Sequence, residues 1–330
     1  MKRVVFAGDR LFRKFPNRQY FVDRLQEIGA ECQFADDVDE AGLHKMAAAA
    51  AALVVIDRRV SRELLQGMQN AELIMTLSVG YDCVDVAAAG ELGIPVSNCP
   101  TYCIDEVAGH AVTLLHAVAR KLHQVLPQTG VGTWYIDYAR PIFSFQGKTL
   151  GIIGLGRIGR AFARKAMPMG VTVAAYDPYV DDDVFDMLGV TRVVDLEELL
   201  PRCDYLSIHA PLTAETFHMI DRRCLALMKD SAYLINTARG AIIHEDDLLE
   251  ALQAGRIAGA ALDVLENEPP APEHPLLHQP RALVTPHMAW YSEESHLKNQ
   301  QLGMQELTRV LSGRRPQYIV NPQVLKSRYQ

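Results

Sequence analysis

Three polar residues in the second half of the chain carry side chains suited to carbonyl chemistry. Arg239, Glu268 and His287 each follow a short apolar run that predicts a strand. Ligands of open α/β sheets bind beyond the carboxyl ends of the strands, so we expect the three to face one crevice. An arginine can hold a carboxylate, a histidine can exchange a proton with a carbonyl oxygen, and a carboxylate can orient the imidazole. The set suits reduction of a carbonyl beside a carboxylate.

Each of these residues also has an ordinary explanation. Arg239 can form a surface salt bridge, Glu268 can be a loop acid like Glu266, and His287 can cap a loop. The chain has eleven histidines, most of which must be non-catalytic. The catalytic hypothesis therefore depends on the sequence around these positions.

A glycine-rich turn in the middle of the chain predicts a phosphate-binding loop. Gly154, Gly156 and Gly159 have the spacing G-x-G-x-x-G, after an apolar strand and at the start of a helix. The first glycine permits a tight turn, the second lets the backbone approach a pyrophosphate, and the third allows close packing of helix and strand. This context favours a dinucleotide at the helix N-terminus.

An acid at the end of the next strand indicates which dinucleotide binds. Asp177 lies eighteen residues after Gly159 and is followed by Pro178 and Tyr179. A carboxylate there accepts the adenosine-ribose hydroxyls and repels a 2′-phosphate, and no arginine follows to neutralise one. The sequence therefore favours NAD over NADP, with an ordinary surface acid as the alternative.

Alternating strands and helices run along most of the chain and predict two α/β domains. The expected strands are 4–7, 32–35, 53–56, 73–77 and 95–97, then 150–153, 172–176, 192–194, 205–208, 232–236, 259–262 and 282–284. The expected helices include 20–28, 40–52, 61–68, a long helix over 105–126 and a last one over 292–311.

The position of the glycine turn predicts how these domains are arranged along the chain. We expect doubly wound parallel sheets of the Rossmann or flavodoxin-like kind in both domains. Residues 100–291 would form the cofactor domain, inserted into a substrate domain built from 1–99 and 292–330. The helix over 105–126 carries apolar residues at spacings that predict one buried face.

Composition excludes several other classes of protein. The 330 residues are 49% apolar and 22% charged with a net charge of -7, which argues for a globular protein that binds no nucleic acid. The longest uncharged apolar run, 46–56, is too short to cross a membrane. Six scattered cysteines show neither disulfide nor metal-ligand spacing, so we expect no metal and a cytoplasmic location.

Several motifs together resemble one enzyme family along nearly the whole chain. These are SVGYD at 78–82, AGELGIPV at 89–96, HAPLTAET at 209–216 and TPHMAWYSEE at 285–294, besides the glycine turn. They are similar to the D-isomer-specific 2-hydroxyacid dehydrogenases, and the last motif most resembles the C-terminal-binding-protein-like branch. The motifs are specific for the family and weakly specific for the substrate.

This resemblance implies roles for individual residues. Arg239 would bind the substrate carboxylate, Glu268 and His287 would form the acid–base pair, and the backbone amides of Val79 and Gly80 would hold the carboxylate. It also implies a homodimer formed through the cofactor domains. Further implied contacts to NAD come from Arg157 and Ile158 at the pyrophosphate, Asp177 at the ribose, Ala210, Thr216, Thr237 and Ala238, and Asp263 at the nicotinamide carboxamide.

Two positions leave questions open. Relatives usually carry an acid where this chain has Gly109, and a glycine inside a helix costs about 1 kcal/mol relative to alanine. Trp290, three residues after His287, either walls the substrate pocket or packs between the domains.

The sequence therefore predicts an NAD-dependent enzyme that interconverts a 2-oxo acid and a D-2-hydroxy acid. An alternative is an NAD(H)-sensing regulatory or scaffold protein, because the C-terminal-binding-protein branch includes co-repressors that retain the same three residues. A third possibility is a dehydrogenase of the same fold that acts on a non-carbon oxyacid such as phosphite.

Overall fold

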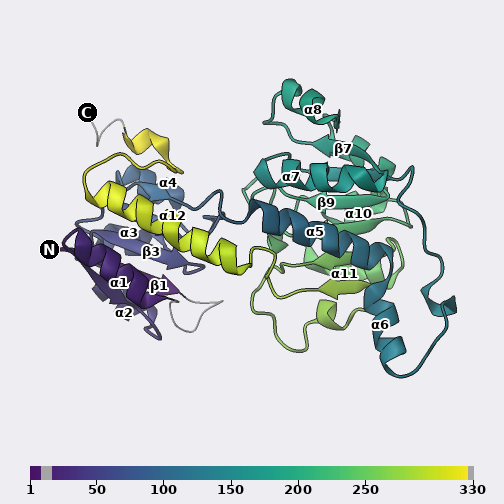
Figure 1. Cartoon of the computed structure of the whole chain (residues 1–330), viewed down its shortest axis with the longest axis horizontal. Helices are drawn as coiled ribbons and strands as arrows, with labels where there is room; N and C mark the ends of the chain where they lie inside the picture. Colours follow the sequence, from purple (N-terminus) through teal and green to yellow (C-terminus); the bar gives the residue numbers. More distant parts are fainter. Residues whose placement is uncertain (9–16, 326–330) are drawn as a thin grey trace. The chain divides into compact units, whose positions relative to one another are not determined.

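The computed structural model describes residues 1–8 and 17–325, and residues 9–16 and 326–330 of the expected substrate domain lie outside this part. The chain forms two compact units. Unit 1 consists of Met1–Cys103 and Ser292–Gln330, and unit 2 consists of Ile104–Tyr291. Each unit is built around one parallel sheet with helices packed against it (Figure 1).

The sheet of unit 1 has five parallel strands in the order β2-β1-β3-β4-β5. Its central strands are buried over their whole length, which explains their continuous apolar sequences. The strands are β1 (Lys2–Gly8), β2 (Ala30–Phe34), β3 (Ala52–Ile56), β4 (Leu73–Thr76) and β5 (Val96–Ser97). The helices are α1 (Arg18–Glu27), α2 (Glu40–Ala47), α3 (Arg62–Gly67), α4 (Val86–Glu91) and α12 (Glu293–Leu311).

The C-terminal helix α12 belongs to the core of unit 1, where it lies beside α1 (Figure 1). A Cβ atom on Gly303 would stand 2.2 Å from Leu77 Cδ2, so glycine allows α12 to approach the end of β4 closely. Asn299 Nδ2 donates to the carbonyl oxygen of Leu77 at 2.8 Å. The buried Glu306 carboxylate accepts from the backbone amides of Gln317 and Tyr318 at 2.6 and 2.9 Å, which secures the segment after the helix.

The sheet of unit 2 has seven parallel strands in the order β12-β11-β10-β9-β6-β7-β8. The chain runs outward from β6 in one direction and then in the other, so the strand order reverses between β6 and β9. This doubly wound topology confirms the predicted fold class. The strands are β6 (Thr149–Ile153), β7 (Thr172–Tyr176), β8 (Thr191–Arg192), β9 (Tyr205–Ile208), β10 (Tyr233–Asn236), β11 (Gly259–Leu262) and β12 (Ala282–Val284).

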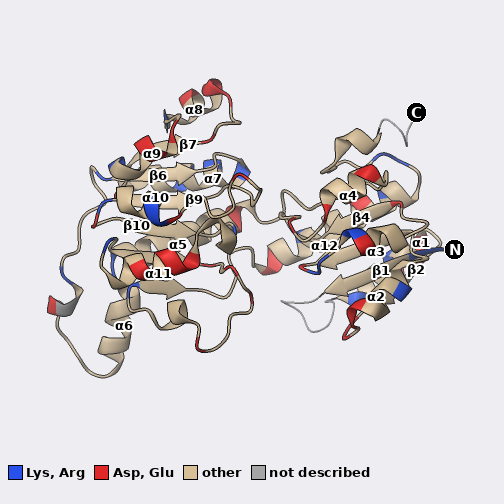
Figure 2. Ribbon diagram, turned by 180° about the vertical axis from the view of Figure 1, so that it is seen from behind, with Lys and Arg blue, Asp and Glu red and all other residues tan. Residues whose placement is uncertain are grey.

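Helices cover both faces of this sheet, and α5 and α7 lie side by side on one of them (Figure 1). Neighbouring residues of a strand therefore point into different clusters, as Ile152 and Ile153 do. The helices are α5 (Ile104–Ala119), α6 (Leu122–Gly130), α7 (Arg157–Ala166), α8 (Asp182–Leu188), α9 (Leu196–Leu199), α10 (Arg222–Leu227) and α11 (Glu245–Gln253). Acidic residues gather in the first turn of α11, where they complement the helix dipole (Figure 2).

The prediction of one helix over 105–126 is wrong. Helix α5 ends at Ala119, and Lys121 adopts a left-handed conformation with φ 53° before α6 begins. Leu122 and Leu126 are consequently 41% and 63% exposed, although the sequence pattern placed them on a buried face. The apolar spacing continues across the break, so periodicity alone did not reveal it.

Smaller differences concern the ends of elements. The expected helix 40–52 stops at Ala47, and the expected strand 192–194 is the two-residue β8, which begins one residue earlier. In the described ranges, no helix has both the length and the apolar character needed to cross a membrane.

Candidate active site

The glycine turn after β6 lies at the point where the strand order reverses. Gly154 has φ +88°, and a Cβ atom there would stand 2.6 Å from the backbone nitrogen of Ala210, which follows β9. A Cβ atom on Gly159 would stand 2.1 Å from the carbonyl oxygen of Gly154. These two glycines therefore allow the turn, α7 and the end of β9 to pack against one another.

Gly156 has a different environment. A Cβ atom built on it meets no described atom within 4 Å, and it is the N-cap of the ten-residue helix α7 without a side-chain cap. The first amides of a helix have no partners within the helix, and here they belong to Arg157, Ile158 and Gly159. An open backbone at a helix N-terminus fits a pyrophosphate.

Asp177 directly follows β7 and is hydrogen-bonded to the glycine turn. Its Oδ2 accepts from the amide of Leu155 at 2.7 Å, and its Oδ1 accepts from the amide of Tyr179 at 2.9 Å. A carboxylate oxygen can accept more than one hydrogen bond, so both retain capacity for ribose hydroxyls. The structure thus brings together the acid and the glycines that the sequence separates.

Two further loops expected to contact NAD follow β9 and β10. Thr216 Oγ1 donates to the carbonyl oxygen of Pro211 at 2.6 Å and so stabilises its own loop. The amide of Ala238 donates to Asn236 Oδ1 at 2.9 Å. Thr237 Oγ1 is buried and has no hydrogen-bond partner within the described chain, which is consistent with a role in binding a ligand.

His287 and Glu268 form a direct pair. His287 Nδ1 lies 2.5 Å from Glu268 Oε2, and each side chain is about one-fifth exposed, at 22% and 20%. Glu268 Oε1 accepts from the amide of Leu265 at 2.9 Å, which orients the carboxylate. Because Nδ1 faces the carboxylate, we assign a proton to it, and Nε2 is the nitrogen on the other side of the ring.

Arg239 lies three residues after β10 in a loop that contacts the Glu268 loop. The buried Asn236 donates through Nδ2 to the carbonyl oxygen of Arg239 at 2.8 Å. A Cβ atom on Gly240 would stand 1.9 Å from the backbone carbon of Leu265, so only glycine permits this approach. Arg239 Nη1 donates to the carbonyl oxygen of Ala238 at 2.8 Å.

Asp263 follows β11 and is 1% exposed. Its carboxylate accepts hydrogen bonds from Thr285 Oγ1 and from the amides of Met288 and Ala289. Sequence reasoning placed Asp263 at the nicotinamide and assigned no role to Thr285, although Thr285 begins the motif that contains His287. Nothing in the sequence pointed to His110, whose Nε2 lies 3.1 Å from Thr285 Oγ1.

In unit 1, the loop after β4 holds Val79 and Gly80 in a defined conformation. Ser78 Oγ donates to the carbonyl oxygen of Gly80 and Asn98 Nδ2 to that of Val79, both at 2.6 Å. The amides of Val79 and Gly80 have no acceptor within the described part of the chain. Such amides can bind a carboxylate.

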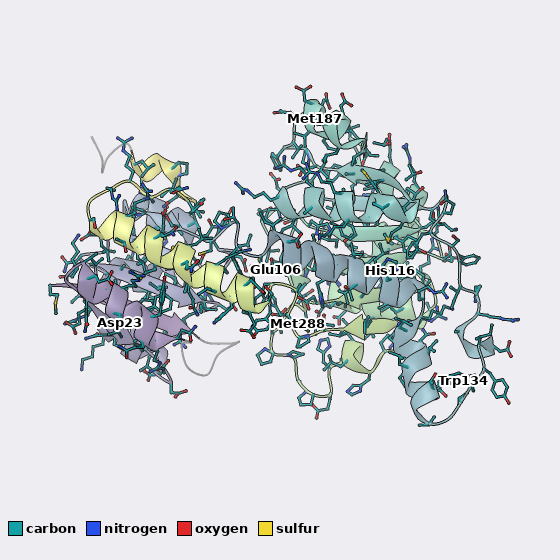
Figure 3. All side chains as sticks on the ribbon, viewed as in Figure 1. Asp23, Glu106, His116, Trp134, Met187 and Met288 are labelled. Carbon is teal, nitrogen blue, oxygen red and sulfur yellow. The ribbon has the colours of Figure 1, made fainter. Side chains whose placement is uncertain are left out.

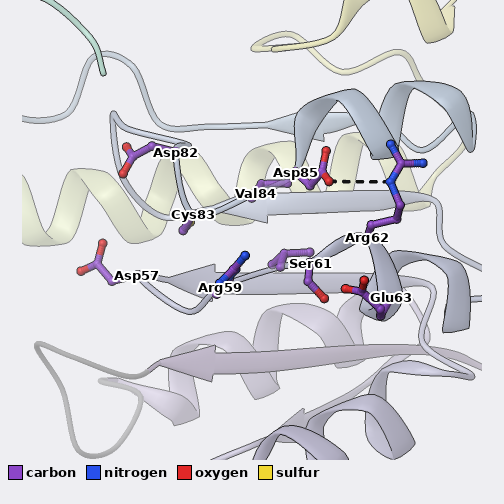
Figure 4. Close-up of a pocket in the computed structure, with 10 residues that line it drawn as sticks. Asp57, Arg59, Ser61, Arg62, Glu63, Asp82, Cys83, Val84 and Asp85 are labelled. Carbon is purple, nitrogen blue, oxygen red and sulfur yellow. Dashed lines mark ion pairs between the residues drawn. The ribbon is translucent and has the colours of Figure 1, made fainter. Parts of the chain in front are cut away.

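Unit 1 also contains a pocket of about 670 Å³ between the segments that follow β3 and β4 (Figure 4). Its lining is mainly charged and includes Asp57, Arg59 and Asp82. Arg62, which also lines the pocket, pairs with Asp85 and Glu91. Asp82 belongs to the SVGYD motif, whereas the sequence assigned no role to Arg59. In unit 2, Trp290 is half-buried with its ring 5.3 Å from that of Tyr291, and its role in specificity stays a prediction.

Comparisons with known proteins relate the chain to one family. Residues 112–289 match the model of the family described as D-isomer specific 2-hydroxyacid dehydrogenase, NAD binding domain. The glyoxylate reductase of Thermofilum pendens is 38% identical over 282 residues, which cover 84% of this chain and 83% of that protein.

The chain is also similar to part of a longer protein and to a solved structure of similar length. The D-3-phosphoglycerate dehydrogenase of Methanocaldococcus jannaschii is 37% identical over 90% of this chain, but the matched region spans only 56% of that protein. The crystal structure of the Aquifex aeolicus D-lactate dehydrogenase, complexed with NAD and lactic acid, has a TM-score of 0.84 and 26% identity over 98% of both chains.

Proposed function

This chain belongs to the D-isomer-specific 2-hydroxyacid dehydrogenase family of NAD-dependent oxidoreductases, and on that basis we propose that it interconverts a 2-oxo acid and a D-2-hydroxy acid. The observation that carries this proposal is the pair formed by His287 Nδ1 and Glu268 Oε2 at 2.5 Å. A histidine oriented by a carboxylate is a suitable acid–base catalyst for a carbonyl oxygen.

In the proposed reduction, Arg239 binds the substrate carboxylate and polarises the adjacent carbonyl. His287 donates the proton from Nε2 to the carbonyl oxygen, and Glu268 stabilises the imidazolium before this transfer. In the reverse direction, neutral His287 accepts the proton of the hydroxyl group. The unbonded amides of Val79 and Gly80 are suited to hold the carboxylate. NAD, when bound, carries the hydride to or from the carbon that bears this oxygen.

We propose that the glycine turn and Asp177 bind this cofactor. The open backbone at Gly156 and the first amides of α7 would hold the pyrophosphate, and Asp177 would accept the ribose hydroxyls. Asp177 would also repel a 2′-phosphate, which favours NAD over NADP. The unpartnered hydroxyl of Thr237 would find a partner in the cofactor.

We also propose that two copies pair through the NAD-binding units. An apolar surface follows α6, where Trp134, Tyr135 and Ile136 are 83%, 74% and 68% exposed. Figure 3 labels Trp134 in this segment. Apolar side chains exposed together are typical of a surface that another protein covers. Sedimentation of the wild-type chain and of Ile136→Glu tests this, and a wild-type monomer would contradict it.

A substrate panel tests the proposed activity. We expect the purified chain to oxidise NADH with at least one of glyoxylate, pyruvate, hydroxypyruvate, phenylpyruvate and 4-methylthio-2-oxobutanoate, and chiral chromatography should identify the D-product. Arg239→Lys should raise KM for the acid because lysine lacks the bidentate fork.

Absence of turnover on every member of the panel would contradict the enzyme proposal. In that case, NADH-dependent capture of a partner protein would support the NAD(H)-sensing alternative. Turnover with phosphite and NAD alone would support the third possibility.

A further inference from the structure

A chain of three polar side chains joins helix α5 to the loop that carries His287. His110 Nε2 lies 3.1 Å from Thr285 Oγ1, and Thr285 Oγ1 donates to Asp263 Oδ1 at 2.5 Å. His110 Nε2 is also 3.4 Å from the same carboxylate oxygen. The side chains of His110 and Asp263 are 17% and 1% exposed, so solvent has little access to the chain.

The chemistry of the groups gives these hydrogen bonds a direction. A threonine hydroxyl has one hydrogen, and Thr285 uses it toward the carboxylate of Asp263. Its oxygen must then accept from His110, so the hydrogen of the neutral His110 ring belongs on Nε2. Hydrogen-bond donation therefore runs from His110 to Thr285 and from Thr285 to Asp263.

Asp263 uses its remaining capacity to hold the backbone around His287. Its Oδ1 accepts from the amide of Met288 at 3.0 Å, and its Oδ2 accepts from the amide of Ala289 at 2.8 Å. Its own carbonyl oxygen accepts from the amide of His287 at 2.8 Å. The backbone from His287 to Ala289 is thus held by Asp263, through its carbonyl oxygen and its buried carboxylate.

His287 needs such support because its backbone is strained. It has φ +51°, a left-handed conformation that is unfavourable for a non-glycine residue and persists only where neighbouring contacts impose it. The hydrogen bonds that Asp263 accepts from the amides of Met288 and Ala289 supply this constraint. The same conformation directs the ring toward Glu268.

We infer that His110, Thr285 and Asp263 form a hydrogen-bond relay that positions His287, and that His110 and Thr285 are positioning residues for the reaction. The catalytic consequence depends on the proposed function, whereas the relay itself does not. The carboxylate of Asp263 accepts three hydrogen bonds inside the protein, so the relay gives this residue a structural task in addition to the nicotinamide contact that the resemblance implies.

The sharpest test compares Thr285→Val, which removes the hydroxyl at constant shape, with Thr285→Ser, which keeps it. We expect Thr285→Val to lower kcat by about 10- to 100-fold, because small displacements of a catalytic group have effects of this size. KM for the 2-oxo acid and Kd for NADH should stay within about threefold, since no binding group is removed. Thr285→Ser should restore kcat.

Hydrogen exchange at the amides of Met288 and Ala289 gives a second measurement that needs no substrate. Thr285→Val and His110→Leu should accelerate exchange at both amides, whereas His110→Gln, which keeps a donor near Nε2, should not. Thr113→Val is the matched control, because Thr113 also lies on α5 but donates to Gly109 rather than to the relay. Its kcat and exchange rates should equal those of the wild type.

Wild-type kcat and exchange rates in Thr285→Val would overturn the inference. A rise in Kd for NADH that equals the fall in kcat would also overturn it, because Asp263 would then act through the cofactor. Failure of the wild-type chain on the whole substrate panel would contradict the proposed function, and the exchange measurement would still decide whether the relay holds the loop.

Discussion

In unit 2, the loops after β6 and β7 differ from the loops after β10, β11 and β12 in which groups they expose. In the loop after β6, glycines permit close packing, and Gly156 leaves an open backbone at a helix N-terminus. After β10, β11 and β12, the loops present side chains, and buried polar residues such as Asn236 and Asp263 hold the backbone that carries them. In the proposed mechanism, pyrophosphate binding therefore depends on the absence of a side chain at Gly156, and acid–base chemistry depends on side chains that are held in place.

The largest expected effect is on kcat and comes from a substitution in the loop after β12. His287→Gln should lower kcat by about a thousandfold, because the variant has no group to transfer the proton. Kd for NADH should remain near the wild-type value if the two sets of loops act separately. Steady-state kinetics and fluorescence titration measure the two quantities, and an unchanged kcat would remove His287 from the proposed mechanism.

A pair of alanine substitutions tests the glycine turn after β6. Gly159→Ala places a methyl group 2.1 Å from the carbonyl oxygen of Gly154, and such overpacking should lower the free energy of unfolding by about 1–3 kcal/mol. Gly156→Ala meets no described atom, so its free energy of unfolding should change by less than about 1 kcal/mol.

Gly156→Ala should instead raise Kd for NADH by about tenfold or more, because its methyl group occupies the space where the pyrophosphate approaches. Denaturant unfolding and NADH titration of both variants measure the contrast. Equal effects of the two variants on NADH affinity at equal stability would show that the glycines do not have separate roles.

His209, which directly follows β9, makes the free energy of unfolding depend on pH. Its ring packs on Phe162 with centroids 4.7 Å apart, and burial lowers the pKa of His209 to about 3. The unfolded chain binds this proton near pH 6.5 and the folded chain does not, so stability is lost as pH falls below 6.5. We expect a loss of at most roughly 1.4 kcal/mol per pH unit from this group.

His209→Gln should make this part of the pH dependence disappear. Ser207 Oγ lies 2.9 Å from His209 Nε2, and glutamine can keep a polar contact there. Urea unfolding of both proteins between pH 4.5 and pH 7.5 provides the measurement. Identical pH profiles would contradict the assignment of the effect to His209.

The smallest effect concerns α5, outside both sets of loops. A Cβ atom on Gly109 meets no described atom within 4 Å, so Gly109→Ala should raise the free energy of unfolding by about 1 kcal/mol. The neighbouring His110 keeps its place in the relay, so kcat should not change. A fall in kcat would show that α5 needs local flexibility at this point.

Local signals explain why much of the fold was predictable. Buried parallel strands read as continuous apolar runs, and the glycine turn has a spacing that few other structures require. The break between α5 and α6 was missed because the apolar spacing continues through Lys121, whose left-handed backbone leaves no signature in the sequence. The homodimer and the role of Trp290 stay predictions.

In the candidate site, too, the sequence indicated which residue types could react but not which partners they contact. The chemical identities of Arg239, Glu268 and His287, their places after strands and the acid at Asp177 were all readable along the chain. Their mutual arrangement was not, because it arises from packing between distant segments: His110 and Thr285 are 175 residues apart. Local sequence could therefore identify the groups able to react, while the folded chain established which buried hydrogen bonds hold them in position.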